Sequence, residues 1–170
     1  MRERVRGLAL PDDDGSGVEL FVATQWLHED QKQIAACLDL PLERVRLTLG
    51  GVGGAFGGRE DISLQVHCCL LALVTKRPIK MQYGREESFY GHIHRHPAKI
   101  FMRHHADRDG TLRRVEARVV LDGGAYASTS SAVLINAVTH MQGPYKCEIA
   151  TVDGYAVRSN NPPCGAMRGF

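Results

Sequence analysis

Short apolar runs and apolar residues at helical spacing organise the first half of the chain. Residues 18–24 are a short apolar run with β-branched members and residues 45–49 alternate, which predicts two strands. Between them, the apolar residues of 28–39 recur at helical spacing, and Pro41 ends the predicted helix. Residues 78–83 predict a further strand.

Polar residues around these elements predict two more helices and an irregular start. A strongly apolar helix is expected from Asp61, as a candidate cap, to about Lys76. A short helix with acidic residues in its first turn is expected over residues 84–92. Residues 1–16 contain Pro11, three consecutive aspartates and two glycines, so we expect a linker or disordered entry there.

The second half of the chain has a clear hairpin pattern. Residues 99–107 and 111–122 alternate around an Asp-Arg-Asp-Gly turn, which is a strong hairpin signal. A helix over residues 131–141 and a strand over 148–157 follow. This mixture of strands and helices predicts an α+β fold in two layers of sheet and helix, with residues 17–170 forming one partial domain.

Composition narrows the functional class only by exclusion. With 44% hydrophobic residues the chain can bury a core, and a formal charge of +2 gives no reason to expect nucleic acid or an acidic membrane surface. Five scattered cysteines without a C-x-x-C pair indicate a reduced, cytoplasmic setting. The end, directly after a Pro-Pro-Cys-Gly turn, leads us to expect a truncated protein with more chain downstream.

The most informative segment is residues 50–58, GGVGGAFGG, with six glycines in nine residues. Glycine allows positive φ and lets a ligand approach backbone N–H groups closely. The segment leads toward a predicted helix start, where free N–H groups favour anions or oxo groups. It therefore predicts a backbone-lined pocket for an oxygen-rich ligand.

Three other interpretations of this segment are less consistent with the residues. A P-loop needs Gly-Lys followed by Ser or Thr, but Gly58 is followed by Arg59. A dinucleotide fingerprint needs a final glycine where Phe56 stands. A mobile surface loop remains an alternative. Phe56 argues against it, because a flexible linker rarely contains an aromatic residue and we expect Phe56 to be buried.

Other clusters suggest chemistry but have plainer explanations. The triplet His92, His94 and His96 resembles a zinc or copper site, although the adjacent Pro97 and arginines favour a solvated or packing role. The STSS run near Asp122 lacks the G-x-S-x-G elbow of a serine hydrolase. We therefore expect no metal ligated directly by these side chains.

Several segments together resemble one enzyme family. Residues 50–60, GGVGGAFGGRE, are similar to the GGGFGGKE segment of the xanthine dehydrogenase and aldehyde oxidase family, and residues 23–25 precede it at the family's spacing. Residues 94–97 resemble the family's RHP stretch, and residues 166–170 resemble its AFRGFG segment. The resemblance covers most of the chain from about residue 17 and implies part of a molybdopterin-binding domain.

The resemblance implies roles for cofactor-binding residues. Gln25 matches the glutamine whose side-chain amide donates a hydrogen bond to the apical oxo ligand of molybdenum. An oxo ligand is a strong acceptor, so an amide N–H donor suits it. Phe56 and Gly57 match the pair beside the metal, and Arg168 matches the arginine that contacts the pterin. The implied cofactor is molybdenum-molybdopterin, with a cytosine dinucleotide form also considered.

The resemblance also implies substrate contacts. Phe56 and Phe170 match aromatic residues beside the substrate ring, and Glu60 matches a glutamate that hydrogen-bonds purines. The family's second purine-binding residue is an arginine, but Asn136 stands at that position, so the purine clamp lacks a charge. A second departure, Ala55 in place of a glycine, still permits a tight turn.

The family's catalytic glutamate lies far downstream, so no residue here is assigned a catalytic role and the isolated chain is expected to be inactive. Iron–sulfur and FAD groups are expected on other domains or subunits, since no cysteine spacing suits a cluster. The implied activity is hydroxylation of a purine or related N-heterocycle with water as the oxygen source. An aldehyde oxidase-like hydroxylase and a non-catalytic truncated module are the alternative functions. The sequence does not decide the electron acceptor or the oligomeric state, for which a dimer is considered.

Overall fold

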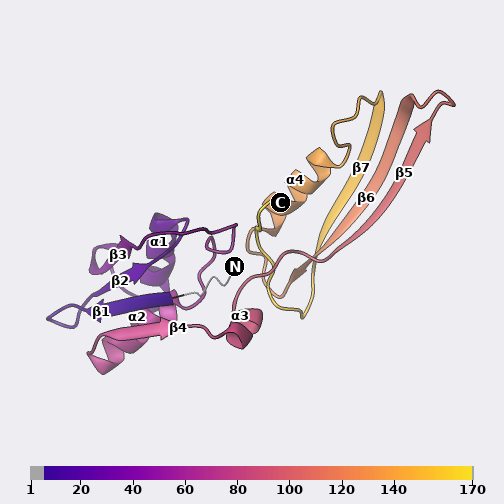
Figure 1. Cartoon of the computed structure of the whole chain (residues 1–170). Helices are drawn as coiled ribbons and strands as arrows, with labels where there is room; N and C mark the ends of the chain where they lie inside the picture. The colour runs from indigo at the N-terminus through magenta and orange to yellow at the C-terminus, as the bar shows by residue number, and fades with distance from the viewer. Residues whose placement is uncertain (1–5, 170) are drawn as a thin grey trace. The chain divides into compact units, whose positions relative to one another are not determined.

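The computed structural model describes residues 6–169, which divide into two compact units on either side of His92 and Ile93. Unit 1 comprises the described residues up to His92, and unit 2 begins at Ile93 (Figure 1). The fold is α+β, as predicted, with one sheet and its helices in each unit. None of the helices in this described range is both long and apolar enough to cross a membrane.

Unit 1 is a four-stranded sheet with helices packed on it. The strand order is β3-β2-β1-β4, with β2 and β3 parallel and the other neighbours antiparallel. Helix α2 contacts β1, β2 and β4, and α1 contacts β3 and α2. The elements are β1 (Arg6–Pro11), β2 (Val18–Val22), α1 (Leu27–Leu38), the 3-10 helix η1 (Leu42–Arg44), β3 (Val45–Leu49), α2 (Gln65–Thr75), β4 (Ile79–Gln82) and α3 (Arg85–Gly91).

The core of unit 1 follows from the alternation of its strands. Val18, Leu20 and Val22 are buried on β2, and they meet Ile34 of α1 and Leu64 at the start of α2 in one cluster. Side chains two residues apart share a face of a strand, so the alternation of these three residues places one face of β2 against the core. Helix α1 ends at Asp39 in the left-handed conformation, just before Pro41, as its sequence predicted.

The predicted linker is wrong for part of its length. Residues 6–11 form β1, an inner strand hydrogen-bonded to β2 on one side and β4 on the other. Its buried positions are Gly7 and Ala9, which carry almost no hydrophobic side chain and so left no alternating signal. Residues 1–5 of that prediction lie outside the described residues.

The predicted cap of α2 is also wrong. The helix begins at Gln65 rather than beside Asp61, and its N-cap residue, Leu64, makes no side-chain capping bond. Instead the Gln65 Oε1 atom accepts a hydrogen bond from the Ser63 backbone N–H at 2.7 Å. Arg59 is hydrogen-bonded to Ala23 and Gln25, which follow β2. Residues 60–64 run from there to the start of the helix, so the helix cannot begin at Asp61.

Unit 2 is a three-stranded sheet with one helix. The predicted hairpin is confirmed: β5 (Ala98–Ala106) and β6 (Leu112–Gly124) are antiparallel, and Gly110 has a φ of 88° in the turn. Helix α4 (Ser130–His140) then connects β6 to the parallel strand β7 (Ile149–Arg158). The helix packs on β7 and β6.

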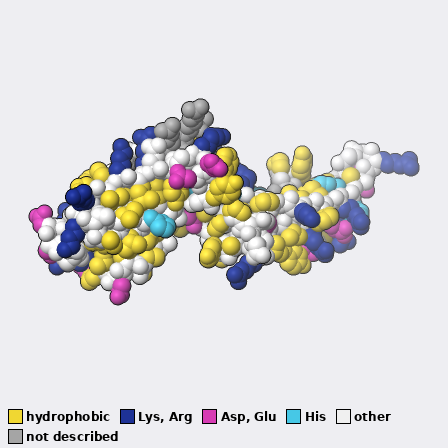
Figure 2. Space-filling view, turned by 90° about the horizontal axis from the view of Figure 1, so that it is seen from below, with side chains coloured by type: hydrophobic (Ala, Val, Ile, Leu, Met, Phe, Trp, Pro, Cys, Tyr) yellow, Lys and Arg dark blue, Asp and Glu magenta, His cyan; other side chains and the backbone are white. Residues whose placement is uncertain are grey.

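The two faces of the unit 2 sheet differ. Val115, Val119 and Leu121 of β6 are buried on the face toward α4. The opposite face carries arginines paired with acids, including Arg103 and Arg114 with Glu116. Figure 2 shows dark blue Lys and Arg side chains gathered near the free end of this sheet. The helix-bearing face therefore holds the core of unit 2.

Candidate functional site

The end of the glycine-rich loop is fastened to the segment that follows β2. The Arg59 carbonyl accepts hydrogen bonds from the Gln25 backbone N–H at 2.9 Å and from the Thr24 hydroxyl at 3.2 Å. The Arg59 guanidinium returns a bond to the Ala23 carbonyl at 3.2 Å. Two segments more than thirty residues apart are thereby held together without belonging to one sheet ladder.

The Gln25 side chain lies at this junction and contacts Arg59 and Glu60, the two residues that follow the glycine-rich loop. Its Oε1 atom accepts a bond from the Arg59 backbone N–H at 3.4 Å, and its Nε2 atom donates to Glu60 Oε1 at 3.2 Å. A primary amide has two N–H donors, so this arrangement commits one and orients the other. The structure thus brings two predicted site residues, Gln25 and Glu60, into direct contact.

Glu60 is a perturbed carboxyl group. Burial raises its pKa above the ordinary range and the negative charge of Asp61 raises it further, while the bond from Gln25 acts in the opposite direction. Its position beside an amide donor suits a group that hydrogen-bonds a polar ligand.

The loop itself has an unusual backbone conformation. Phe56 has a φ of 53° and Gly57 a φ of 86°, and the Gly58 N–H donates to the Ala55 carbonyl at 2.8 Å to close a turn. A left-handed conformation costs a bulky residue roughly 1–3 kcal/mol and is concentrated at functional sites. The expected burial of Phe56 is wrong, since 44% of this residue is exposed. Its glycine neighbours supply few side chains that could cover the ring.

The glycines of the loop leave open space beside the backbone. A Cβ atom added to Gly51 or Gly53 would meet nothing within 4 Å. Packing within the described chain therefore does not require glycine at these two positions. Close approach of a ligand to the peptide N–H groups would require it, which fits an oxygen-rich group held by backbone donors.

Beneath this junction lies a buried acid that the sequence did not single out. Asp30 of α1 is 0% exposed, and the Gln65 Nε2 atom donates to its Oδ2 at 3.4 Å. Burial raises the pKa of Asp30, with smaller opposing effects from Thr24 and Gln65. Its place in the first turn of an amphipathic helix was the available signal, but an acid there is usually exposed.

Asp30→Asn is expected to stabilise the chain at neutral pH by roughly 1 kcal/mol, because an ionised carboxyl group is costly to bury. The folded pKa of Asp30 is raised, so its destabilising charge appears as pH rises through that pKa. The advantage of Asp30→Asn should therefore be small near pH 4 and grow toward pH 7. Urea unfolding at several pH values measures it.

Glu29→Gln is the matched control, since Glu29 is exposed and pairs with Lys32 on the same helix. It should leave the pH dependence of the unfolding free energy unchanged. An equal effect of Glu29→Gln, or a constant advantage of Asp30→Asn at all pH values, would show that ionisation of the buried acid is not the cause.

In unit 2 the terminal segment is held by the residues that lead into β5. The His94 N–H donates to the Pro163 carbonyl at 3.1 Å, and the Gly165 N–H donates to the His94 carbonyl at 3.0 Å. The Arg95 Nη2 atom donates to the Arg168 carbonyl at 2.6 Å. This places the backbone of Arg168, while Phe170 lies outside the described residues.

Asp122 fixes the loops at the same end of unit 2. Its Oδ1 atom accepts bonds from the Ser159 hydroxyl at 2.6 Å and from the Gly124 N–H at 3.0 Å. These bonds, with one from Asn161 and the charge of His96, lower the pKa of Asp122. This anchoring role was not predicted from the sequence, because the partners Ser159 and Asn161 follow Asp122 by 37 and 39 residues.

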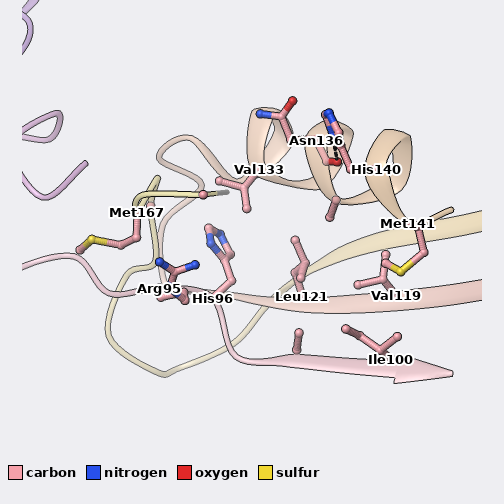
Figure 3. A pocket seen from close by; sticks show the side chains of 14 residues that line it. Arg95, His96, Ile100, Val119, Leu121, Val133, Asn136, His140, Met141 and Met167 are labelled. Carbon is pink, nitrogen blue, oxygen red and sulfur yellow. Dashed lines mark hydrogen bonds between the residues drawn. The ribbon is translucent and has the colours of Figure 1, made fainter. Parts of the chain in front are cut away.

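A cavity of about 430 Å³ lies between the sheet and α4 in unit 2 (Figure 3). Predicted residue Asn136 is on its wall, as is His96, whose Nε2 atom lies 2.7 Å from the Ser130 hydroxyl oxygen. Burial lowers the pKa of His96, against an opposing effect of Asp122. Within residues 6–169 no three His, Cys, Asp or Glu side chains are grouped to hold a metal ion.

The comparison with known families agrees with this geometry. The family model for the molybdopterin cofactor-binding domain matches residues 3–170, so the chain belongs to that family. The family resemblance inferred from the sequence motifs is thereby confirmed.

Two curated relatives illustrate the relationship. The chain is 39% identical over 164 residues to a probable xanthine dehydrogenase subunit of Bacillus subtilis (strain 168), covering 96% of this chain and 22% of that protein. It is 41% identical over 164 residues to the nicotinate dehydrogenase large molybdopterin subunit of Eubacterium barkeri, covering 96% of this chain and 38% of that protein. The chain therefore spans well under half the length of these relatives.

Solved structures share the fold. The quinoline 2-oxidoreductase of Pseudomonas putida 86 is similar with a TM-score of 0.84 and 26% identity, over 97% of this chain and 22% of that one. The aldehyde oxidoreductase of Desulfovibrio gigas has a TM-score of 0.89 at 22% identity, over 99% of this chain and 18% of that one. At that identity the second likeness concerns the fold alone.

Proposed function

We propose that the chain is the part of a molybdenum-dependent hydroxylase that holds one side of the molybdopterin cofactor. The observation that carries the proposal is the junction of Gln25 with the glycine-rich loop, where an amide donor and an open backbone converge. Such donors suit an oxygen-rich metal group. When bound, the molybdenum centre supplies the oxidising chemistry, with water as the source of oxygen.

Each site residue has a proposed task. Gln25 donates its second amide hydrogen to the cofactor's oxygen, and the backbone of Gly57 approaches the same group. Phe56, exposed at the end of the loop, forms a wall shared by cofactor and substrate. Arg168 contacts the pterin. Phe170 and Asn136 complete the substrate contacts.

We propose a purine or related N-heterocycle as substrate. Glu60 supports this choice, because its carboxyl group lies beside the Gln25 amide and can form charge-assisted hydrogen bonds with a nitrogen heterocycle. Relatives named for xanthine and nicotinate, at 39% and 41% identity, point the same way. The likeness to the aldehyde oxidoreductase of Desulfovibrio gigas, at 22% identity, concerns the fold alone and adds no support for the aldehyde alternative.

The remaining parts of the enzyme are also proposals. We place the catalytic glutamate downstream, so the 170-residue chain alone should show no hydroxylase activity. The rest of the large subunit and iron–sulfur and FAD domains or subunits are the proposed partners, and a dimer and a cytosine dinucleotide form of the cofactor are further proposals. The proposed location is the cytoplasm. The alternative is that the chain is a non-catalytic module. Hydroxylase activity of the longer protein would exclude this alternative.

Glu60→Ala in the cofactor-loaded, full-length protein is expected to lower kcat/KM for hypoxanthine about tenfold or more. A charge-assisted hydrogen bond contributes enough free energy for a loss of this size. Oxidation of an aldehyde, which has no ring nitrogen, should be spared. Steady-state kinetics on both substrates measure the difference.

Glu86→Ala, which removes an exposed acid of α3, is the matched control and should change neither rate. Molybdenum content should be equal in all three proteins. Equal losses on hypoxanthine and aldehyde would contradict a purine contact by Glu60 and favour a general role in the loop.

A further inference from the structure

The cavity of unit 2 has donors at one end and an apolar body. Among the described residues that line it there is no aspartate or glutamate. Arg95 and His96 lie side by side at one end (Figure 3). Ile100, Val119 and Leu121 line the sheet side. A pocket of this kind selects an uncharged or anionic ligand with a hydrophobic body and excludes a cation.

His96 is a buried imidazole with one ring nitrogen uncommitted. The residue is 8% exposed, its Nε2 atom bonds with Ser130, and its Nδ1 atom is buried without a hydrogen-bond partner. When the Ser130 hydroxyl donates to Nε2, the neutral ring carries its hydrogen on Nδ1. A buried donor without an acceptor costs free energy, which an acceptor atom of a ligand would recover.

Arg95 supplies the positive charge beside this donor. Its guanidinium is held by the bond from Nη2 to the Arg168 carbonyl, so its direction is fixed by the terminal segment. A guanidinium has five N–H donors, and the fork of donors matches the two oxygens of a carboxylate. One bond to a carbonyl leaves most of that donor set for another acceptor.

Taken together, the geometry points to a binding site for a flat aromatic carboxylic acid in the unit 2 cavity. The carboxylate lies against Arg95 and His96, and the ring lies against the apolar sheet residues beside α4. About 430 Å³ accommodates a one-ring or two-ring acid. The inference goes beyond the proposed function, because binding of such an acid in this cavity needs neither the cofactor nor Glu60.

The test uses two probes that share a ring, nicotinate and its neutral amide nicotinamide, with the cofactor-free 170-residue chain. Amide NMR titration is expected to show nicotinate binding about tenfold more tightly, because a charge-assisted contact adds to the same ring burial. The shifted signals should be those of Val119, Val133 and Ala137 on the cavity wall. Equal affinity for both probes, or shifts confined to other residues, would overturn the inference.

Variants assign the effect to the cavity. Arg95→Gln should weaken nicotinate about tenfold and leave nicotinamide unchanged, whereas Arg103→Gln, the same change on exposed strand β5, should alter neither. Ala137→Phe fills the cavity from α4 and should abolish binding of both probes without touching the Arg95–Arg168 bond. Undiminished nicotinate binding by Ala137→Phe would refute the site even if Arg95→Gln fails to fold.

The cofactor plays no part in this binding assay, which separates the two proposals. Loss of the expected nicotinate preference, with hydroxylase activity of the longer protein intact, overturns the aromatic-acid site alone. Nicotinate binding as described, with no activity in the longer protein, overturns the hydroxylase proposal alone.

Discussion

Gly124→Ala is expected to destabilise unit 2 by about 2–4 kcal/mol. Gly124 has a φ of 72°, and a Cβ atom there would clash with the Pro162 carbonyl oxygen. The obstacle is backbone rather than a flexible side chain, so the loop before the terminal segment must move. Denaturant unfolding, followed by the amide signals of β6 and β7, measures the change.

Gly110→Ala is a control that isolates backbone strain. Gly110 also has a positive φ, of 88°, but nothing lies within 4 Å of a Cβ atom there. It should cost only about 1 kcal/mol, the ordinary penalty of a left-handed alanine. Similar losses for the two variants would mean that the contact with Pro162 contributes nothing and that φ alone matters.

Gln25→Ala is expected to lower turnover of the cofactor-loaded, full-length protein about 100-fold, the usual effect of removing one preorganised donor. Molybdenum content should fall as well, because the substitution also removes the acceptor of the Arg59 N–H and loosens the loop. Metal analysis and steady-state kinetics on the same preparations give the two readouts.

Gln25→Glu separates donation from anchoring. The substituted side chain keeps an oxygen for the Arg59 N–H but has no donor, and it stands beside the Glu60 carboxyl group. If Gln25 acts as a donor, Gln25→Glu should be as impaired as Gln25→Ala. Recovery of normal turnover in Gln25→Glu would assign Gln25 a purely structural task.

The parts of the fold that were predictable are those with a strong periodic signal. Strand β3 begins and ends at the predicted residues, and the β5–β6 hairpin has its turn at the Asp-Gly pair. Strand β1 escaped prediction because its buried positions, Gly7 and Ala9, have little or no side chain to show alternation. There the hydrogen bonds of two neighbouring strands outweigh a local sequence that indicates a turn.

The candidate site was predictable only where residues stand in a recognisable order. Resemblance to a family placed Gln25 and Glu60 in one site, and the structure joins them by a hydrogen bond. The pairing of His96 with Ser130 was not foreseen, because 34 residues separate them and only the fold brings them together. The exposure of Phe56 was also missed, since a glycine-rich sequence does not reveal which side chains would cover it.

Strain and polar contacts in the loop have a common explanation. The left-handed conformation of Phe56 costs free energy, and Glu60, whose pKa is raised by burial, follows it four residues later in the chain. Such costs persist where surrounding contacts enforce them, here through Arg59 and Gln25. We therefore interpret the loop as preorganised for a ligand rather than as a flexible connection.

The most direct test of this account is a crystal structure of the longer protein with its cofactor bound. The account predicts a cofactor oxygen within hydrogen-bond distance of the Gln25 Nε2 atom, with the backbone N–H groups of the 50–58 loop directed toward the same group. A cofactor bound elsewhere, with Gln25 contacting only Arg59 and Glu60, would contradict it.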